Sequence, residues 1–152
     1  MTKIVFVCHG NICRSPMAEY IFKYLISQKN ISEDFEISSA ATSSEALHRD
    51  MHVKAKAELD KHNIPYSKFE SRQISYPIYK GADYVVCMEE FNAINLKRFL
   101  LLCKTEKVKL LMDFTDEPKD VDDPWYSGDF VTAYNEIYKG CTALLDYLVN
   151  NK

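Results

Sequence analysis

A cysteine and an arginine stand close together near the N-terminus, in the segment Cys8-His-Gly-Asn-Ile-Cys-Arg-Ser15. The five residues between Cys8 and Arg14 allow a loop to curl so that successive backbone N–H groups point at one anion. Arg14 can bind two phosphoryl oxygens with its planar guanidinium, and Gly10 gives the loop backbone freedom. The same donors favour the thiolate of Cys8, the form in which a cysteine is a nucleophile. The segment therefore predicts a phosphate-binding loop with Cys8 as the nucleophile.

A phosphoryl transfer to Cys8 leaves an alkoxide, which a nearby neutral carboxylic acid would protonate. Asp123 is the candidate, because Pro124 disfavours a helical backbone before it and so fixes its carboxyl on a defined loop. An Asp-Pro pair is also a common turn. Three other acidic residues of this region compete for the role: Asp116, Asp120 and Asp122.

The elements around the loop are those that an anion-binding site requires. The apolar run Lys3–Cys8 predicts a buried strand that ends at the nucleophile. A helical pattern follows, with Ser15 expected as the N-cap and Pro16 at the first helical position. A Cys-x5-Arg pattern is frequent by chance, and a buried structural thiol is the alternative. The strand–loop–helix setting favours the phosphate site.

Strands and helices alternate along the rest of the chain. Further strands are predicted at Phe35–Ser39, Ala82–Met88 and Val108–Met112, and helices at about 51–62, 89–99 and 130–149. The polar stretch 42–50 is expected to be a loop. This order predicts one three-layer αβα domain over residues 1–152, with a central four-stranded, mostly parallel twisted sheet and helices on both faces. Ligands are expected beyond the carboxyl ends of the strands.

Composition narrows the classes of function. A net charge of −3 gives no basic excess for nucleic-acid binding, and no stretch reaches the roughly 20 apolar residues of a membrane span. Five cysteines without paired spacing favour reduced thiols, and no second pair of Cys or His residues completes a zinc site with Cys8 and Cys13. We expect a cytoplasmic monomer that uses neither metal nor cofactor and binds neither nucleic acid nor membrane.

The string from Phe6 to Glu19, Phe-Val-Cys-His-Gly-Asn-Ile-Cys-Arg-Ser-Pro-Met-Ala-Glu, resembles the signature of the low-molecular-weight protein-tyrosine phosphatases. The resemblance continues in order through Ser38–Ala41, Ser71–Gln73, Asp83–Met88 and Asp123–Tyr126. It implies a hydrolase that acts on phosphotyrosine-bearing proteins and small aryl phosphates. In that family the aspartate of the Asp-Pro-aromatic-Tyr motif is the general acid and then the base, and Asp123 is the matching residue.

The resemblance also implies roles for residues around Cys8. Trp125 and Tyr126 match the wall of a cleft for an aromatic ring, although two aromatic residues after a proline also serve as packing residues. Cys13 matches a cysteine that can form a disulfide with the nucleophile and protect it from deeper oxidation. The substrate-binding residues that the resemblance implies also include His9, Gly10, Asn11, Ile12, Cys13 and Ser15. Asn11 and Ser15, with Ser39 in a supporting position, match polar residues that shape the phosphate loop through hydrogen bonds.

Three places depart from the family pattern. His9 stands where a leucine is common, and an imidazole there would change the cleft rim or simply be solvated. The region near Ser44-Glu45 is polar where the family often has a large aromatic residue that forms the opposite wall. Phe69 stands where a histidine often supports the loop through a serine. Substrate preference and the support of the loop therefore remain open at this level.

Three alternatives share the phosphate loop. An arsenate reductase needs two further cysteines in relay, whereas Cys87 lies in a predicted strand and Cys103 follows a separate helix. A phosphoarginine phosphatase is associated with a small polar residue at the position of Ile12, so Ile12 favours phosphotyrosine. A phosphocysteine carrier or a non-hydrolytic phosphate-binding module would not need both Arg14 and Asp123.

Overall fold

A single sheet of four parallel strands lies at the centre of the computed structural model, which describes residues 1–101 and 105–150. The strands are β1 (Thr2–Cys8), β2 (Phe35–Ala41), β3 (Tyr84–Cys87) and β4 (Val108–Leu110), in the spatial order β2-β1-β3-β4. The predicted α/β class and strand number are confirmed. The sheet is wholly rather than mostly parallel.

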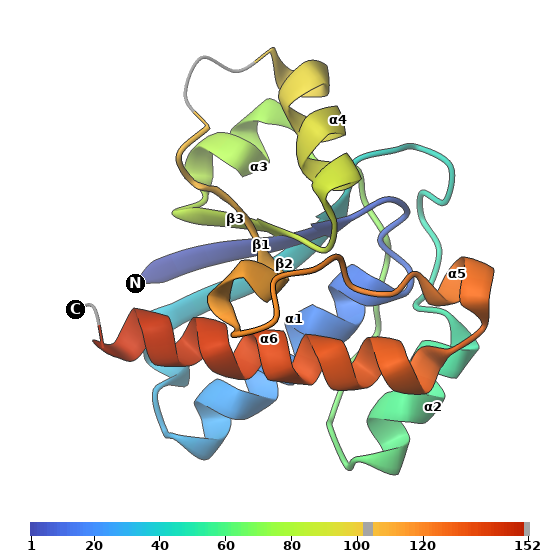
Figure 1. Ribbon diagram of the computed structural model, residues 1–152, viewed down its shortest axis with the longest axis vertical. Helices are drawn as coiled ribbons and strands as arrows, with labels where there is room; N and C mark the ends of the chain where they lie inside the picture. The colour runs from blue at the N-terminus through green and yellow to red at the C-terminus, as the bar shows by residue number, and fades with distance from the viewer. Residues whose placement is uncertain (102–104, 151–152) are drawn as a thin grey trace.

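Helices cover both faces of this sheet and complete the three predicted layers. They are α1 (Arg14–Gln28), α2 (Val53–Lys61), α3 (Tyr76–Gly81), α4 (Glu90–Leu100), α5 (Pro124–Ser127) and α6 (Phe130–Asn150), with single turns of 3₁₀ helix at η1 (Ser32–Asp34) and η2 (Leu111–Phe114). Figure 1 shows α3 and α4 on one side of the sheet and α1, α2 and α6 on the other.

The alternation of side chains along β1 explains why both faces need a cover. Ile4 and Phe6 pack into the larger apolar cluster under α1 and α6, whereas Val5 and Val7 pack into the smaller cluster under α3 and α4. All four side chains are at most 5% exposed. A strand buried on both faces reads as a continuous apolar run, which is what Lys3–Cys8 shows.

Two predicted strands are shorter in the structure. Ala82 is not in β3 but ends α3, with its backbone N–H donating to the carbonyl of Tyr79. Leu111 and Met112 belong to η2, which turns the chain away from β4. Helix α3 itself was not predicted, because a helix of six residues spans less than two turns and shows little periodicity.

The prediction that Ser15 caps α1 is wrong. The helix begins one residue earlier, at Arg14, with Cys13 in the N-cap position and no side-chain cap. The Ser15 hydroxyl contacts the Cys8 sulfur instead of a backbone N–H. Recruitment of this hydroxyl to the loop accounts for the difference.

Membrane-spanning helices, metal-binding clusters and two further cysteines were also subjects of the sequence analysis. No helix within residues 1–101 and 105–150 is long and apolar enough to cross a membrane. The same part of the chain holds no cluster of three or more His, Cys, Asp or Glu side chains arranged to bind a metal. Cys87 is fully buried in β3, as expected for a strand residue. Cys103 lies outside the described residues.

Candidate active site

A cleft of about 350 Å³ opens at the carboxyl edge of the sheet. Its floor is the loop that follows β1, and its walls come from the segment around Glu45, the start of α4 and the residues around Asp123. Two backbone bonds hold the exit of β1 between its neighbours: Thr42 N–H donates to Cys8 O at 3.0 Å, and Met88 N–H donates to Val7 O at 3.1 Å. The carboxyl end of β1 therefore positions Cys8 at the floor of the cleft.

The Cys8 sulfur accepts hydrogen bonds from two directions. The backbone N–H of Asn11 lies 3.3 Å from Sγ, and the Ser15 hydroxyl lies 3.0 Å from it. Ser15 Oγ also accepts a bond from Asn11 Nδ2 at 2.8 Å, so its own proton is available to the sulfur. Hydrogen bonds to a thiolate stabilise that form, and this geometry supports a nucleophilic Cys8.

Asn11 holds the loop in shape from beneath. Its φ of 60° is in the left-handed region, which asparagine tolerates better than most residues. Its side chain donates to Ser15 and Ser39 and accepts from the backbone N–H of Arg72. Asn11 and Ser15 are both fully buried and do not line the cleft. Both residues therefore lie behind the cleft surface and make hydrogen bonds within the loop, the kind of contact that the resemblance implies for them.

The support of Ser39 differs from the family pattern. Ser39 Oγ donates to Glu19 Oε1 at 2.6 Å, and Glu19 Oε2 is paired with Lys23 Nζ at 2.7 Å. Phe69 instead packs edge-on against Tyr20, with ring centroids 6.3 Å apart. The network of the loop includes a carboxylate and runs from Glu19 through Ser39, Asn11 and Ser15 to Cys8.

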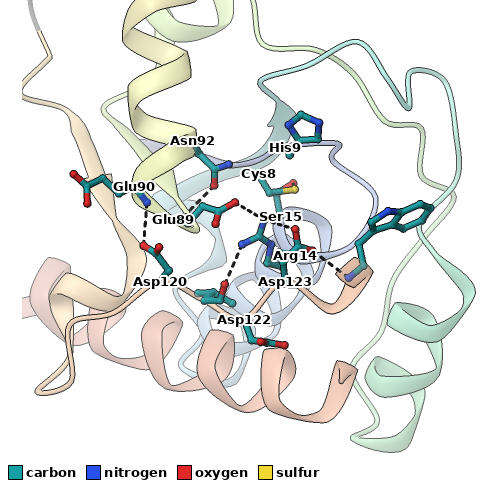
Figure 2. A network of polar contacts seen from close by, with 12 residues as sticks. Cys8, His9, Arg14, Ser15, Glu89, Glu90, Asn92, Asp120, Asp122 and Asp123 are labelled. Atoms are coloured by element: carbon teal, nitrogen blue, oxygen red, sulfur yellow. Dashed lines mark hydrogen bonds and ion pairs between the residues drawn. The ribbon is translucent and has the colours of Figure 1, made fainter. Parts of the chain in front are cut away.

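Arg14 is buried at the base of the cleft, with 2% of its surface exposed. Its guanidinium donates to Val121 O at 3.0 Å, to Glu89 Oε1 at 2.9 Å and to Asp123 Oδ2 at 3.3 Å (Figure 2). Burial lowers the pKa of Arg14, but the charges of Cys8, Asp123 and Glu89 outweigh that effect and leave the pKa above its ordinary value. The site therefore keeps a permanent cation beside Cys8.

Asp123 is the acidic residue of its loop that the structure brings to Arg14 and the cleft. Its Oδ1 accepts from Trp125 N at 3.1 Å and so caps the short helix α5, while Oδ2 faces Arg14. The three competing residues have other partners: Asp116 pairs with Lys139, Asp120 accepts from Glu90 N, and Asp122 accepts from Ser127 Oγ. Geometry thus favours Asp123 among the four candidates.

Cys13 also lines the cleft, although its side chain differs from that of Cys8 in environment. Burial, followed by the negative charges of Cys8 and Asp123, raises the pKa of Cys13 to about 12. Cys13 is therefore a neutral thiol at physiological pH. It is available as a second sulfur but is a poor nucleophile.

The rim of the cleft carries the departures from the family pattern. His9 Nε2 and Glu45 Oε2 lie 2.7 Å apart and join the phosphate loop to the polar stretch 42–50. Ser43 strengthens this connection, because its N–H and Oγ both bond to His9 O. Gly10 and Ile12 complete the loop surface.

Three residues around the site were not singled out from the sequence: Glu19 and Glu89, which bond to Ser39 and Arg14, and Phe91, which lines the cleft. Glu19 ends the string that carries the family resemblance, so its position was a usable signal. Glu89 follows almost directly after β3, where the carboxyl edge of a parallel sheet gathers site residues. Phe91 had no such signal, because an aromatic residue in the first turn of a helix is ordinarily a packing residue.

The fold and the cleft define a class of protein. A cysteine and an arginine share an anion-binding loop at the carboxyl edge of a parallel sheet, and a carboxylic acid approaches from a separate segment. This arrangement suits phosphoryl transfer through a cysteine.

The chain belongs to the low molecular weight phosphotyrosine protein phosphatase family, whose model matches residues 3–152. It is 37% identical over 148 residues to the human low molecular weight phosphotyrosine protein phosphatase, covering 94% of this chain and 93% of that one. It is 36% identical over 151 residues to the low molecular weight protein-tyrosine-phosphatase PtpA of Staphylococcus aureus, covering 99% and 96%. The crystal structure of YfkJ from Bacillus subtilis superposes with a TM-score of 0.96 at 31% identity, covering 100% and 97%. The chain is an enzyme of this hydrolase family.

Proposed function

We propose that this phosphatase hydrolyses phosphotyrosine in proteins through a phosphocysteine on Cys8. The observation that carries the proposal is the meeting of Arg14 with Cys8 and Asp123 at one cleft, although Arg14 and Asp123 are 109 residues apart in the chain. Each of the three has a role that phosphoryl transfer requires: nucleophile, cation and acid.

In the first step the Cys8 thiolate attacks phosphorus, and the bond from phosphorus to the phenolic oxygen breaks. Asp123 gives its proton to that oxygen, so the leaving group departs as a neutral phenol. Arg14 and the backbone N–H groups of the loop stabilise the charge on the three equatorial oxygens.

In the second step Asp123 takes a proton from water, and the water oxygen bonds to phosphorus. The sulfur–phosphorus bond breaks, its electron pair returns to Cys8, and inorganic phosphate leaves. The atoms and charges balance without a metal or an organic cofactor.

The cleft favours an aryl phosphate over other esters. Trp125 and Tyr126 are 60% and 85% exposed, and both line the cleft above the loop. Exposed aromatic rings beside a phosphate site can pack against the aromatic ring of a substrate. Ile12 adds an apolar surface to the loop, which suits an aromatic ring better than a charged guanidinium group.

The proposed setting is the cytoplasm, with phosphotyrosine-bearing proteins as substrates and the enzyme acting as a monomer. Five cysteines without paired spacing support a reducing compartment. The four within the described residues are free: Cys8, Cys13, Cys87 and Cys141. Whether Cys8 and Cys13 form a protective disulfide under peroxide is tested by a Cys13→Ser variant. Equal recovery of this variant and the wild type under thiol reductant would contradict the protective role.

The deciding experiment is phosphate release from a phosphotyrosine peptide at mildly acidic pH, without added metal, for the wild type beside Cys8→Ser. We expect release by the wild type and none by the variant. Absence of release by the wild type would overturn the proposal, and parallel assays with phosphoarginine and arsenate would identify the alternative activity. If the enzyme itself stayed phosphorylated on Cys8 in water alone, this stable phosphocysteine would indicate a carrier.

A further inference from the structure

The region near Ser44-Glu45 supplies no aromatic wall to this cleft, in line with its polar sequence. Glu45 is 74% exposed and pairs with His9, and the next residue to line the cleft is the small Ala46. A substrate ring would therefore meet no aromatic surface on this side. A large apolar side chain from a different element, Phe91 of α4, lines the cleft as well.

Hydrogen bonds fix the backbone around Phe91, although the residue itself is 59% exposed. It stands in the first turn of α4, between Glu89 and Asn92, whose side chains each bond to the other's backbone in a capping box. Glu89 is also bonded to Arg14, and Glu90 N donates to Asp120 at 3.0 Å (Figure 2). The backbone under Phe91 is thus fixed to the catalytic arginine and to the acid-bearing segment. An exposed ring on so well fixed a backbone is suited to binding a ligand.

Trp125 supplies an aromatic surface from the other segment of the cleft. Its backbone N–H bonds to Asp123, and its indole meets the edge of the His52 ring, with centroids 6.1 Å apart. Phe91 and Trp125 each follow, by two residues, a carboxylate that contacts Arg14. Their placement is tied to that of the phosphate loop.

We propose that Phe91 is a specificity-determining residue that forms the second aromatic wall of the cleft, so that the substrate ring binds between Phe91 and Trp125. This inference rests on the proposed function and deepens it, because it assigns the recognition of the ring to α4 rather than to the loop 42–50. Aromatic pairs contribute beyond the apolar area that they bury, so the wall selects aryl phosphates over alkyl phosphates.

The test compares two ligands that carry the same anion and are not hydrolysed: phenylphosphonate and methylphosphonate. Calorimetry gives their dissociation constants for the wild type, Phe91→Ala, Phe91→Tyr and Phe99→Ala. Phe99 is the matched control, because it lies on α4 and is 50% exposed but does not line the cleft. Circular dichroism verifies that each variant is folded.

We expect Phe91→Ala to weaken phenylphosphonate binding about threefold to tenfold and to leave methylphosphonate binding unchanged. Phe91→Tyr should retain the wild-type preference, and Phe99→Ala should match the wild type. The inference would be overturned if the ratio of the two dissociation constants in Phe91→Ala equalled the wild-type ratio, whether neither constant changed or both rose by the same factor. Turnover of the phosphotyrosine peptide by the wild type is measured separately. Its absence would overturn the proposed function, while the phosphonate constants would still decide the role of Phe91.

Discussion

Arg14 is surrounded by groups of opposite charge, which offset the free-energy cost of burying its cation. A buried charge is costly unless it is paired and hydrogen-bonded, and Arg14 has two carboxylates and a backbone carbonyl as partners. Asp123 is one of these partners and is also the proposed acid. A bound phosphoryl group offers Arg14 new acceptors, which leaves the Asp123 carboxyl available to the leaving oxygen.

Asp123→Asn tests that role through the leaving group. The amide keeps the shape of the carboxyl but has no proton to give, so turnover should fall far more for aryl phosphates with poor leaving groups than for those with good ones. Steady-state kinetics over a series of substituted phenyl phosphates gives the slope. An equal loss across the series would show that Asp123 does not act as the acid.

Glu19→Ala tests the support of the loop by this carboxylate network. Removal of the carboxylate leaves Ser39 without its acceptor and loosens the orientation of Asn11, so kcat should fall about tenfold while KM changes little. Glu19→Gln keeps an acceptor for Ser39 and should retain most of the activity.

Lys23→Met is the matched control for this network. Lys23 pairs with Glu19 but its side chain is 43% exposed, so the ion pair contributes little in water. Activity of Lys23→Met near that of the wild type would place the effect on the Ser39 bond. A loss in Lys23→Met as large as that in Glu19→Ala would contradict this account.

At the scale of elements, helix α2 is joined to the cleft through the residue that precedes it. His52 Nδ1 accepts from Lys54 N at 3.1 Å and so caps α2, and His52 N donates to Ile12 O of the phosphate loop at 2.8 Å. Its ring stacks on Phe130 of α6 with centroids 5.0 Å apart. A neutral imidazole is required for the cap, because a protonated ring has no acceptor.

His52 makes the fold sensitive to mild acid. Burial, with a smaller effect of Lys54, lowers the pKa of His52. The unfolded chain therefore takes up a proton at higher pH than the folded one, and the stabilisation by neutral His52 is lost as pH falls below the ordinary value of about 6.5. We expect His52→Asn, which keeps a capping side chain, to lose less stability between pH 7 and pH 5.5. Thermal unfolding across this range measures the difference, and parallel curves for the two proteins would contradict the expectation.

The contact between α6 and η2 depends on a glycine. A Cβ at Gly140 would lie 2.5 Å from Leu111 Cγ, and Leu111 is fully buried. Gly140→Ala gains roughly 1 kcal/mol of helix propensity, but overpacking costs about 1–3 kcal/mol. We expect net destabilisation and a melting temperature several degrees lower. Asn135→Ala on the exposed face of α6 is the control, and a Gly140→Ala protein as stable as the wild type would show that Leu111 moves aside freely.

Prediction from sequence succeeded where the signal is local. The loop from Cys8 to Ser15 and the apolar run before it are contiguous, so the residue types alone indicate the strand, the anion site and the helix. Ser15 was predicted as an N-cap and, from the resemblance, as a residue that shapes the loop through hydrogen bonds, because both roles require the same residue type. Only the cap was wrong. Glu89 and Phe91 were missed because the bond of Glu89 to Arg14 and the position of Phe91 at the cleft arise only when α4 is folded against the loop.

For the whole molecule, the two apolar clusters share one sheet, since successive residues of β1 belong to alternate clusters. Neither cluster can form without that strand. We therefore expect residues 1–152 to unfold as one domain in a single cooperative transition. Coincident denaturation curves from far-ultraviolet and near-ultraviolet circular dichroism would support this expectation. Two separated transitions would contradict it. Fluorescence is unsuitable as the global probe, because the single tryptophan, Trp125, is 60% exposed at the cleft.

The partners of Arg14 lie 75, 107 and 109 residues further along the chain. A ribosome extends a chain at roughly 5–20 residues per second, so Cys8 and Arg14 leave it on the order of seconds before Glu89, Val121 and Asp123 exist. A nascent chain therefore holds the proposed nucleophile and Arg14 but lacks the proposed acid and the carboxylates that contact the guanidinium. We therefore expect the chain to gain phosphatase activity only after residue 123 has been synthesised and has folded against the loop.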